Sequence, residues 1–314
     1  MSVEASVIIP ARDASATVGR TLACLAAQES DVKFEVIVVD DGSRDDTAWV
    51  VEGSDGLARL LRQDRRGAAQ ARNHGAEAAQ GSLLAFLDAD CFPSPGWLDA
   101  GVRALADADL VQGRVLPDPD ARLGAFDRTL WVTENVGLWQ TANLFATRSL
   151  FERIGGFEDW LPVEIGKLMA EDLWFGWRAT RAGARSAFSP DALAHHAVFP
   201  RGPADYVAER RRLRYFPEIA SKMPELRKTM FFAGLFLSRR TAAFDLGVAA
   251  TATAVARRSP LPLLAWAPYV LDARNRARWR GRRAPLVAAV DTLADGLGLV
   301  ELVRGSVRSR TPVF

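Results

Sequence analysis

The segment Leu83–Asp90, LLAFLDAD, ends a short apolar run with two carboxylates, and no other feature constrains the fold as strongly. Gly81 precedes the run and Pro93 follows it, a pattern that indicates a buried strand. Side chains alternate along an extended backbone, so Asp88 and Asp90 point to the same side. Two hard oxygen ligands suit Mg²⁺ or Mn²⁺ held with a phosphorylated substrate, although an aspartate-rich turn contains the same residues.

Strand-like and helix-like segments alternate through the first half of the chain. We expect strands at Ser6–Pro10, Phe34–Val39 and Leu83–Leu87, and helices at Ala68–Ala79 and Pro95–Ala106. This alternation predicts an α/β fold with a mainly parallel central sheet flanked by helices. Ligands bind such sheets outside the carboxyl ends of the strands. Polar clusters follow the three expected strands, at Pro10–Asp13, Asp40–Ser43 and Asp88–Asp90.

Charge is distributed unevenly along the chain. The 40 basic and 38 acidic side chains nearly cancel, yet residues 227–314 hold fifteen basic and five acidic ones. That region therefore has a net charge of +10, which leaves −8 for residues 1–226. We expect two parts with different tasks: a catalytic domain at residues 1–226 and a basic, apolar helical region at residues 227–314.

The region after Lys228 has the composition of a surface that meets lipid. Arginines separate four apolar segments, Thr229–Leu237, Ala242–Ala256, Ser259–Leu271 and Ala284–Val303. None offers the ~20 uninterrupted apolar residues that a membrane span requires. We expect helices that lie in the membrane interface, with a short hairpin across Ala242–Leu271; a soluble helical subdomain or an oligomer interface is the alternative. The positive charge would place the protein on the cytoplasmic side of the cell membrane.

Other features narrow the function classes. Cys24 and Cys91 lack metal-ligand spacing, so we expect both to be reduced residues of a protein in the cytoplasm. The apolar run at Ser6–Pro10 is too short for a signal peptide. The basic tail contains no groove-reading motif, which argues against a nucleic-acid partner.

Five motifs in order resemble the family 2 glycosyltransferases of the GT-A fold. They are SVIIPARD, FEVIVVDDGSRDDT, GAAQARNHGAEAAQGSLLAFLDAD, NLFATRSLFERIGGFED and AEDLWFGWRATRAGAR. The resemblance covers residues 3–215, about two thirds of the chain. It implies a Rossmann-like nucleotide-binding half followed by an acceptor half.

The resemblance assigns the nucleotide of a nucleotide-diphosphate sugar to the first two strand ends. The residues concerned are Pro10, Ala11, Arg12, Asp13 and Asp41. Asp41 would accept hydrogen bonds from a base imide or a ribose hydroxyl, although Asp at this position also suits a turn. Arg72 would reach a phosphate or hold a metal-binding carboxylate through forked hydrogen bonds.

The same resemblance assigns a divalent metal, Mn²⁺ or Mg²⁺, to Asp90. It gives Asp88 to the ribose or to a metal-bound water. His195 or His196 would complete the metal site, as in many metal-dependent GT-A enzymes. Adjacent residues of a strand point to opposite faces, so at most one of the two can bind.

Glu171 and Asp172 form a second carboxylate pair, at the start of a helix. From the residues alone, Asp172 suits an N-cap. The resemblance makes the pair catalytic, with Asp172 as the general base, and we expect the helix start to lower its pKa. A base without a positioned nucleophile implies single displacement with inversion. Trp131, Trp139 and Trp160 are candidates for stacking on the acceptor or for the core.

The segment RRLRY differs from the Gln-x-x-Arg-Trp sequence of processive synthases. Arg211 stands in place of Gln and Tyr215 in place of Trp, so we expect a non-processive enzyme. Arg212 and Arg214 would bind the diphosphate on a closing loop, or belong to a solvated face.

We therefore expect an inverting, metal-dependent transfer of a sugar from a nucleotide-diphosphate sugar. The acceptor would be a lipid-linked or cell-envelope glycan at the cytoplasmic membrane face. The alternatives are a nucleotidyltransferase and a non-catalytic nucleotide-sugar-binding or membrane scaffold protein.

Overall fold

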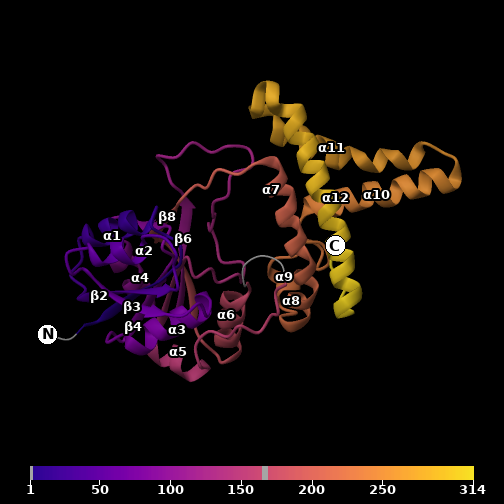
Figure 1. The fold of residues 1–314 in the computed structure, drawn as a ribbon. Helices are drawn as coiled ribbons and strands as arrows, with labels where there is room; N and C mark the ends of the chain where they lie inside the picture. The colour runs from indigo at the N-terminus through magenta and orange to yellow at the C-terminus, as the bar shows by residue number, and fades with distance from the viewer. Residues whose placement is uncertain (1–2, 165–168) are drawn as a thin grey trace. The chain divides into compact units, whose positions relative to one another are not determined.

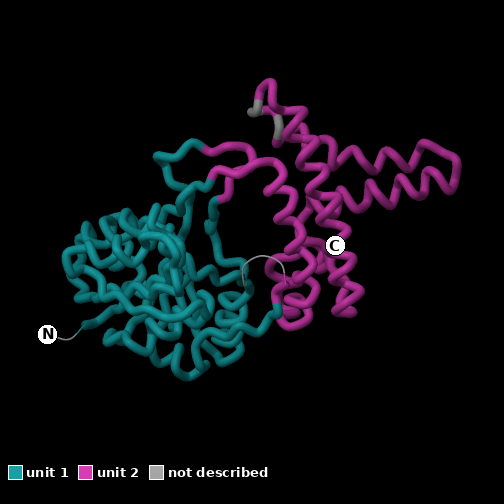
Figure 2. Tube along the Cα trace, viewed as in Figure 1, with its two compact units in different colours: residues 1–122, 129–162, 167–199 teal, residues 123–128, 163–166, 200–314 magenta. Residues whose placement is uncertain are grey.

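The computed structural model describes residues 3–164 and 169–314, which form two compact units. Unit 1 consists of residues 1–122, 129–162 and 167–199, and unit 2 of residues 123–128, 163–166 and 200–314 (Figure 2). The main division thus falls at Phe199, where the backbone contacts separate. The boundary expected between residues 226 and 227 was placed where the composition changes. That these two parts have different tasks stays a prediction.

Unit 1 is an α/β fold around a mixed, mostly parallel sheet, as the alternating pattern predicted (Figure 1). Its strand order is β3-β2-β1-β4-β7-β6-β8-β5. The strands are β1 (Ala5–Ala11), β2 (Phe34–Asp41), β3 (Ala58–Gln63), β4 (Leu83–Leu87), β5 (Cys91–Pro93), β6 (Leu110–Pro117), β7 (Asn143–Thr147) and β8 (Ser186–His196). Strands β3, β2, β1 and β4 run parallel, β7 is antiparallel to β4 and β6, and β5 is antiparallel to β8.

Helices cover both faces of this sheet. They are α1 (Val18–Ala26), α2 (Thr47–Glu52), α3 (Ala68–Ala78), α4 (Trp97–Leu105), α5 (Arg148–Ile154) and α6 (Glu171–Arg181). Alternate side chains of β2 point to the two faces of the sheet. Val36 and Val38 belong to the core cluster that contains residues of α1, α2 and α4. Ile37 and Val39 pack on the other face with Ala71 of α3. On β4, Phe86 contacts Phe151, Phe157 and Phe175 in a group of aromatic rings.

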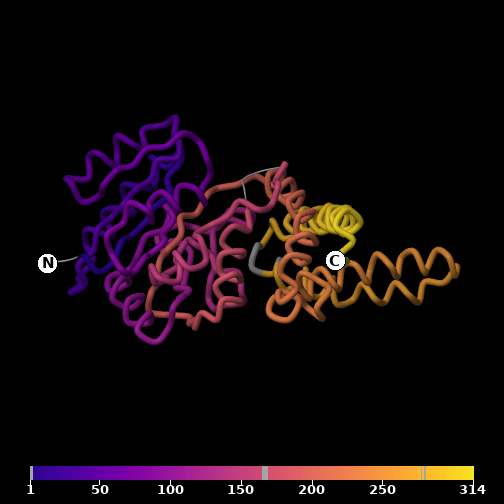
Figure 3. The backbone as a smooth tube through the Cα atoms, turned by 90° about the horizontal axis from the view of Figure 1, so that it is seen from below, coloured from indigo at the N-terminus to yellow at the C-terminus, as the bar shows by residue number. Residues whose placement is uncertain are grey.

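Unit 2 is helical, as the C-terminal composition indicated. Its elements are α7 (Pro203–Ala208), η1 (Glu209–Tyr215), α8 (Phe216–Lys222), α9 (Leu226–Thr229), α10 (Arg239–Arg257), η2 (Leu261–Trp266), α11 (Ala267–Ala277), η3 (Arg278–Arg283) and α12 (Ala284–Ser309). Helix α10 lies beside η2 and α11 in an extended hairpin (Figures 1 and 3). Among the helices of the described residues, none has the length and apolar character to cross a membrane.

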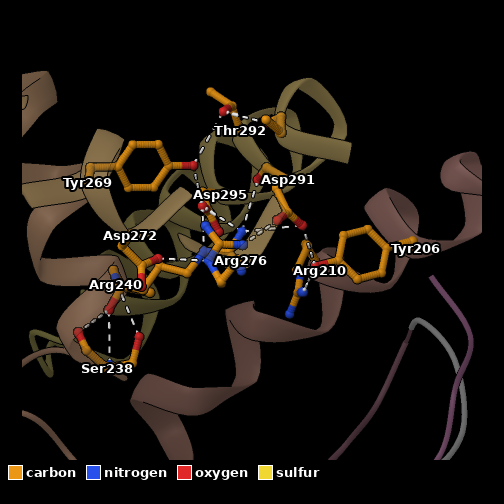
Figure 4. Close-up of polar contacts among 12 residues, drawn as sticks. Tyr206, Arg210, Ser238, Arg240, Tyr269, Asp272, Arg276, Asp291, Thr292 and Asp295 are labelled. Atoms are coloured by element: carbon orange, nitrogen blue, oxygen red, sulfur yellow. Dashed lines mark hydrogen bonds and ion pairs between the residues drawn. The ribbon is translucent and has the colours of Figure 1, made fainter. Parts of the chain in front are cut away.

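Buried ion pairs connect the helices of unit 2. Arg240 of α10 lies 2.8 Å from Asp295 Oδ2 and 3.5 Å from Asp291 Oδ1, both on α12. Figure 4 shows that Arg276 of α11 and the Tyr206 hydroxyl also point toward Asp291. Two arginines from different helices therefore share one carboxylate of α12, which ties α10 and α11 to α12.

Asp245, on α10, is the exception to this pairing. Its Oδ2 is buried and accepts no hydrogen bond from the described residues. It lines a cavity of about 190 Å³ together with Arg210, Arg240 and Asp295. Burial, and then the charge of Asp295, raises the pKa of Asp245 to about 6. Folding thus favours the protonated carboxyl.

We predict that Asp245 makes stability fall as the pH rises. The stabilisation that comes from protonating this carboxyl in the folded state is fully present below about pH 4. It declines between about pH 4 and about pH 6 and is lost above that. The Asp245→Asn variant lacks this titration, so its melting temperature should exceed that of the wild type near neutral pH and approach it in acid. Thermal melts of both proteins across this pH range test the prediction, and a constant difference would contradict it.

Candidate active site

The loops after β1 and β2 are joined at the carboxyl edge of the sheet. Asp13 has a left-handed backbone with φ of 48°. Its backbone N–H donates to Ser43 Oγ at 3.0 Å, and its carboxylate accepts from the Arg44 N–H at 2.8 Å. Arg12 lies beside it, with its Nε 3.7 Å from Asp13 Oδ2. The structure thus brings the predicted nucleotide-binding loops together.

Asp41, at the end of β2, is 3% exposed and holds the loop that leads into α3. Its Oδ1 accepts from Gln63 Nε2 at 2.8 Å and from the Arg66 N–H at 2.7 Å, and its Oδ2 accepts from the Gly67 N–H at 2.9 Å. These bonds give Asp41 a structural task, in line with the turn role considered as its alternative. The contact of Asp41 with a base or ribose stays a prediction.

Arg72 is the central cation of the site. Its guanidinium contacts Asp88 Oδ1 at 2.8 Å and Glu171 Oε1 at 3.2 Å, and its side chain is 5% exposed. Burial alone would lower the pKa of Arg72, but these two carboxylates raise it above its ordinary value. Arg72 therefore carries its charge and joins the aspartates after β4 to the carboxylate pair of α6.

The general-base candidate Asp172 lies in the first turn of α6, directly after Glu171. Burial, and then the charge of Glu171, raises the pKa of Asp172 to about 8. The expectation that the helix start lowers this pKa is wrong. Its one backbone hydrogen bond, from the Leu173 N–H at 2.7 Å, does not outweigh burial beside a second carboxylate. The alternative role of Asp172 as the N-cap is not observed, because Ala170 occupies that position.

Asp90 and His196 form the metal-site candidate. Residues Cys91 of β5 and His196 of β8 are paired in register, which brings His196 Nε2 to 3.6 Å from Asp90 Oδ1. The Nδ1 of His196 is 2.6 Å from the Ala197 carbonyl oxygen, so a proton there leaves Nε2 as a ligand. His195 points instead to the Pro117 carbonyl oxygen at 3.2 Å. The register thus selects His196.

One carboxylate and one imidazole suit Mn²⁺, and less completely Mg²⁺. The described residues contain no group of three or more candidate ligands. Asp88 is held by Arg72, so water and the phosphates of a substrate would have to supply the rest of a metal's coordination shell.

The turn expected on the acceptor side is held against α3. Asn73 accepts from the Phe157 N–H at 2.8 Å and donates to the Phe157 carbonyl oxygen at 2.9 Å, which fixes the turn at Gly155 and Gly156. Near the start of α6, Trp160 donates from Nε1 to the Ala170 carbonyl oxygen at 3.0 Å, and its ring lies 6.3 Å from that of Trp174.

The three tryptophans considered for stacking differ in burial. Trp139 is buried, and a Cβ on Gly176 would stand 2.0 Å from its ring, so Trp139 is a core residue. Trp131 is 59% exposed. Trp160 is the one that lies next to α6, and its stacking on an acceptor stays a prediction.

One residue near the site, Asp159, escaped the sequence analysis. Asp159 hydrogen-bonds with Gln70 and lies near Glu171 and Arg72, and burial followed by the charge of Glu171 raises its pKa. The sequence indicated these residues by their position alone. Gln70 lies in the first turn of the helix that carries Arg72, and Asp159 comes two residues after the Gly-Gly-Phe turn.

Arg212 and Arg214 belong to unit 2. Arg214 pairs with the buried Glu301 of α12 at 2.7 Å, which anchors η1 to α12. Their binding of a diphosphate stays a prediction.

Known proteins resemble this chain in sequence and in fold. The sequence profile of Glycosyl transferase family 2 matches residues 6–157. The chain is 31% identical over 212 residues to the glycosyltransferase AglE of Haloferax volcanii, covering 63% of this chain and 68% of AglE.

Two solved structures share the fold. The mannosyltransferase PcManGT of Pyrobaculum calidifontis, solved with GDP-Man and Mn²⁺, has a TM-score of 0.59 at 20% identity, over 99% of this chain and 88% of its own. Residues 1–349 of S. aureus TarS, solved with UDP-GlcNAc, have a TM-score of 0.52 at 17% identity, over 98% and 92%.

We predict that removing the Arg72 charge costs stability. In the Arg72→Met variant two carboxylates lose their common partner, so the free energy of unfolding should fall by about 3 kcal/mol. Adding Glu171→Gln should restore part of this loss, since the more buried carboxylate becomes neutral. Urea unfolding of the single and double variants measures both effects.

The control is Arg62→Met, which breaks the exposed pair of Arg62 with Glu52. Its cost should stay below about 1 kcal/mol. Equal losses for the two single variants would contradict the role given to Arg72.

Proposed function

Since this chain belongs to family 2 of the glycosyltransferases, we propose that it transfers a sugar from a nucleotide-diphosphate sugar to an acceptor hydroxyl in one inverting displacement. The observation that carries the proposal is the double contact of Arg72. One partner, Asp88, lies at the donor edge of the sheet, and the other, Glu171, adjoins the base candidate Asp172. A donor and an acceptor held at these places would meet over Arg72.

The donor's nucleotide would lie on the joined loops after β1 and β2, in contact with Pro10, Ala11, Arg12, Asp13 and Asp41. Asp90 and His196 would hold a divalent metal with the diphosphate. When bound, that metal neutralises the charge that develops on the departing diphosphate. Arg72 keeps Asp88 in place and adds a fixed positive charge near the leaving group.

The acceptor proton would go to Asp172. A carboxyl with a raised pKa is a stronger base once ionised, so its burial beside Glu171 suits proton removal better than a low pKa would. Glu171, next to Asp172, forms an ion pair with the Arg72 guanidinium. With no nucleophile placed for a covalent intermediate among the proposed residues, the reaction would invert the anomeric carbon.

We predict that Asp172→Asn abolishes transfer and leaves donor binding intact. The amide preserves shape but accepts no proton, so the rate should fall by a factor on the order of 100 or more. Single-turnover assays with each nucleotide sugar, paired with titration calorimetry of the donor, test this. An unchanged rate would remove Asp172 from its role as the base.

We also predict that the two histidines differ in metal dependence. His196→Gln should weaken Mn²⁺ binding in the presence of a nucleotide diphosphate by roughly tenfold or more, because a direct ligand is lost. His195→Gln is the matched control and should bind as the wild type does. The reverse order, measured by titration calorimetry, would show that the β8 register has been misassigned.

The acceptor that fits unit 2 best is a lipid-linked or cell-envelope glycan at the cytoplasmic membrane face. The α10–η2–α11 hairpin exposes apolar side chains, namely Leu246, Val255, Leu261, Leu264, Val270 and Leu271. Arg257 and Arg258 lie at its turn. Exposed apolar residues framed by arginines favour an anionic bilayer surface. Tyr215, in place of the Trp of processive synthases, is buried and accepts from the Glu164 N–H at 2.8 Å, which supports a single-addition enzyme.

A further inference from the structure

A second cavity in unit 2, of about 480 Å³, opens between α11, η3 and the start of α12. Its lining combines two kinds of surface. Arg274 and Arg278 contribute guanidinium groups, and Val270, Ala273, Ala284 and Ala288 contribute apolar ones. Tyr269 and Thr292 close the side toward the ion pairs of Figure 4, where the Tyr269 hydroxyl donates to Asp295. The cavity is therefore large enough for part of a small amphipathic molecule.

The charge of this cavity is of one sign. Arg276, on the same helix, is directed to Asp272 and Asp291 and is neutralised there. Among the described residues, Arg274 and Arg278 are the charged ones of the cavity lining, which includes no carboxylate. Two guanidinium groups one helical turn apart can both donate to one phosphate group.

The surroundings of the cavity favour a lipid over a soluble anion. Val270 is 56% exposed in the cavity wall. Leu271 and Leu286, which adjoin the lining residues Val270 and Pro285 in the sequence, are 58% and 56% exposed. A soluble phosphate compound would leave these side chains in water. An acyl or isoprenoid chain would cover them while its phosphate stayed on the two arginines.

We propose that this cavity binds the phosphate head group of an anionic membrane lipid, with the chain along Val270, Ala284 and Ala288. The inference rests on the proposed membrane location of unit 2 and specifies how that unit would recognise the bilayer. Head-group recognition by paired guanidinium groups would make binding depend on fork geometry as well as on charge.

The test uses the full-length chain and floating vesicles of phosphatidylcholine, with and without phosphatidylglycerol. Binding to the anionic vesicles should fall roughly thirtyfold in the Arg274→Gln/Arg278→Gln variant, since each arginine near the surface contributes about a factor of five. The charge-preserving Arg274→Lys/Arg278→Lys variant should also lose binding. If it binds as the wild type does, only diffuse charge attraction operates and the head-group site is refuted.

Ala288→Phe is the second variant, because it fills the apolar part of the cavity without changing charge. It should weaken vesicle binding while its melting temperature and far-UV circular dichroism show a folded chain. Binding of inorganic phosphate that needs both arginines, without vesicle binding, would assign the cavity to a soluble anion and overturn the proposal. Equal binding to neutral vesicles would overturn it as well.

A separate readout keeps the two proposals apart. The thermal shift by nucleotide diphosphates with Mn²⁺ should be unchanged in all three variants, which lie outside the donor site. Absence of that shift in the wild type would count against the transferase proposal alone, and absence of lipid binding against the cavity alone.

Discussion

The burial of the Arg72 guanidinium is the constraint on which the site depends. A buried cation requires carboxylates within contact distance, and the chain supplies them from two directions, Asp88 after β4 and Glu171 at the start of α6. The next residue, Asn73, holds the backbone of Phe157 through two hydrogen bonds. Successive residues of α3 thus hold the end of β4 and the turn at Gly155 and Gly156.

The carboxyl groups around Arg72 respond differently because their surroundings differ. Glu171 contacts the Arg72 guanidinium, whereas Asp172 is buried beside Glu171 and has a raised pKa. The ion pair of Glu171 and the raised pKa of Asp172 suit an ion-pairing role for the first and a proton-accepting role for the second. Both residues lie in the first turn of α6. There, burial and the charge of Glu171 raise the pKa of Asp172 more than the helix dipole lowers it.

Much of unit 1 could be predicted from local pattern, because short apolar runs followed by polar clusters are local features. The strands β1, β2 and β4 and the aspartates at their ends follow directly from it. The pKa of Asp172 could not, since it depends on burial. The choice between His195 and His196 depends on the pairing of β8 with β5, a three-residue strand too short to show a pattern. In unit 2, the composition indicated helices. It could not indicate that Asp291 forms ion pairs with Arg240 and Arg276 of two other helices, because such pairs depend on how the helices pack.

The most direct test of the account is a thermal-shift comparison of nucleotide diphosphates and nucleotide sugars, each with and without Mn²⁺. The account predicts that compounds of one base raise the melting temperature, and that Mn²⁺ is needed for the full shift, because Asp90 and His196 offer an incomplete ligand set that the diphosphate completes. A folded protein that no nucleotide stabilises, or that responds equally without metal, would contradict it.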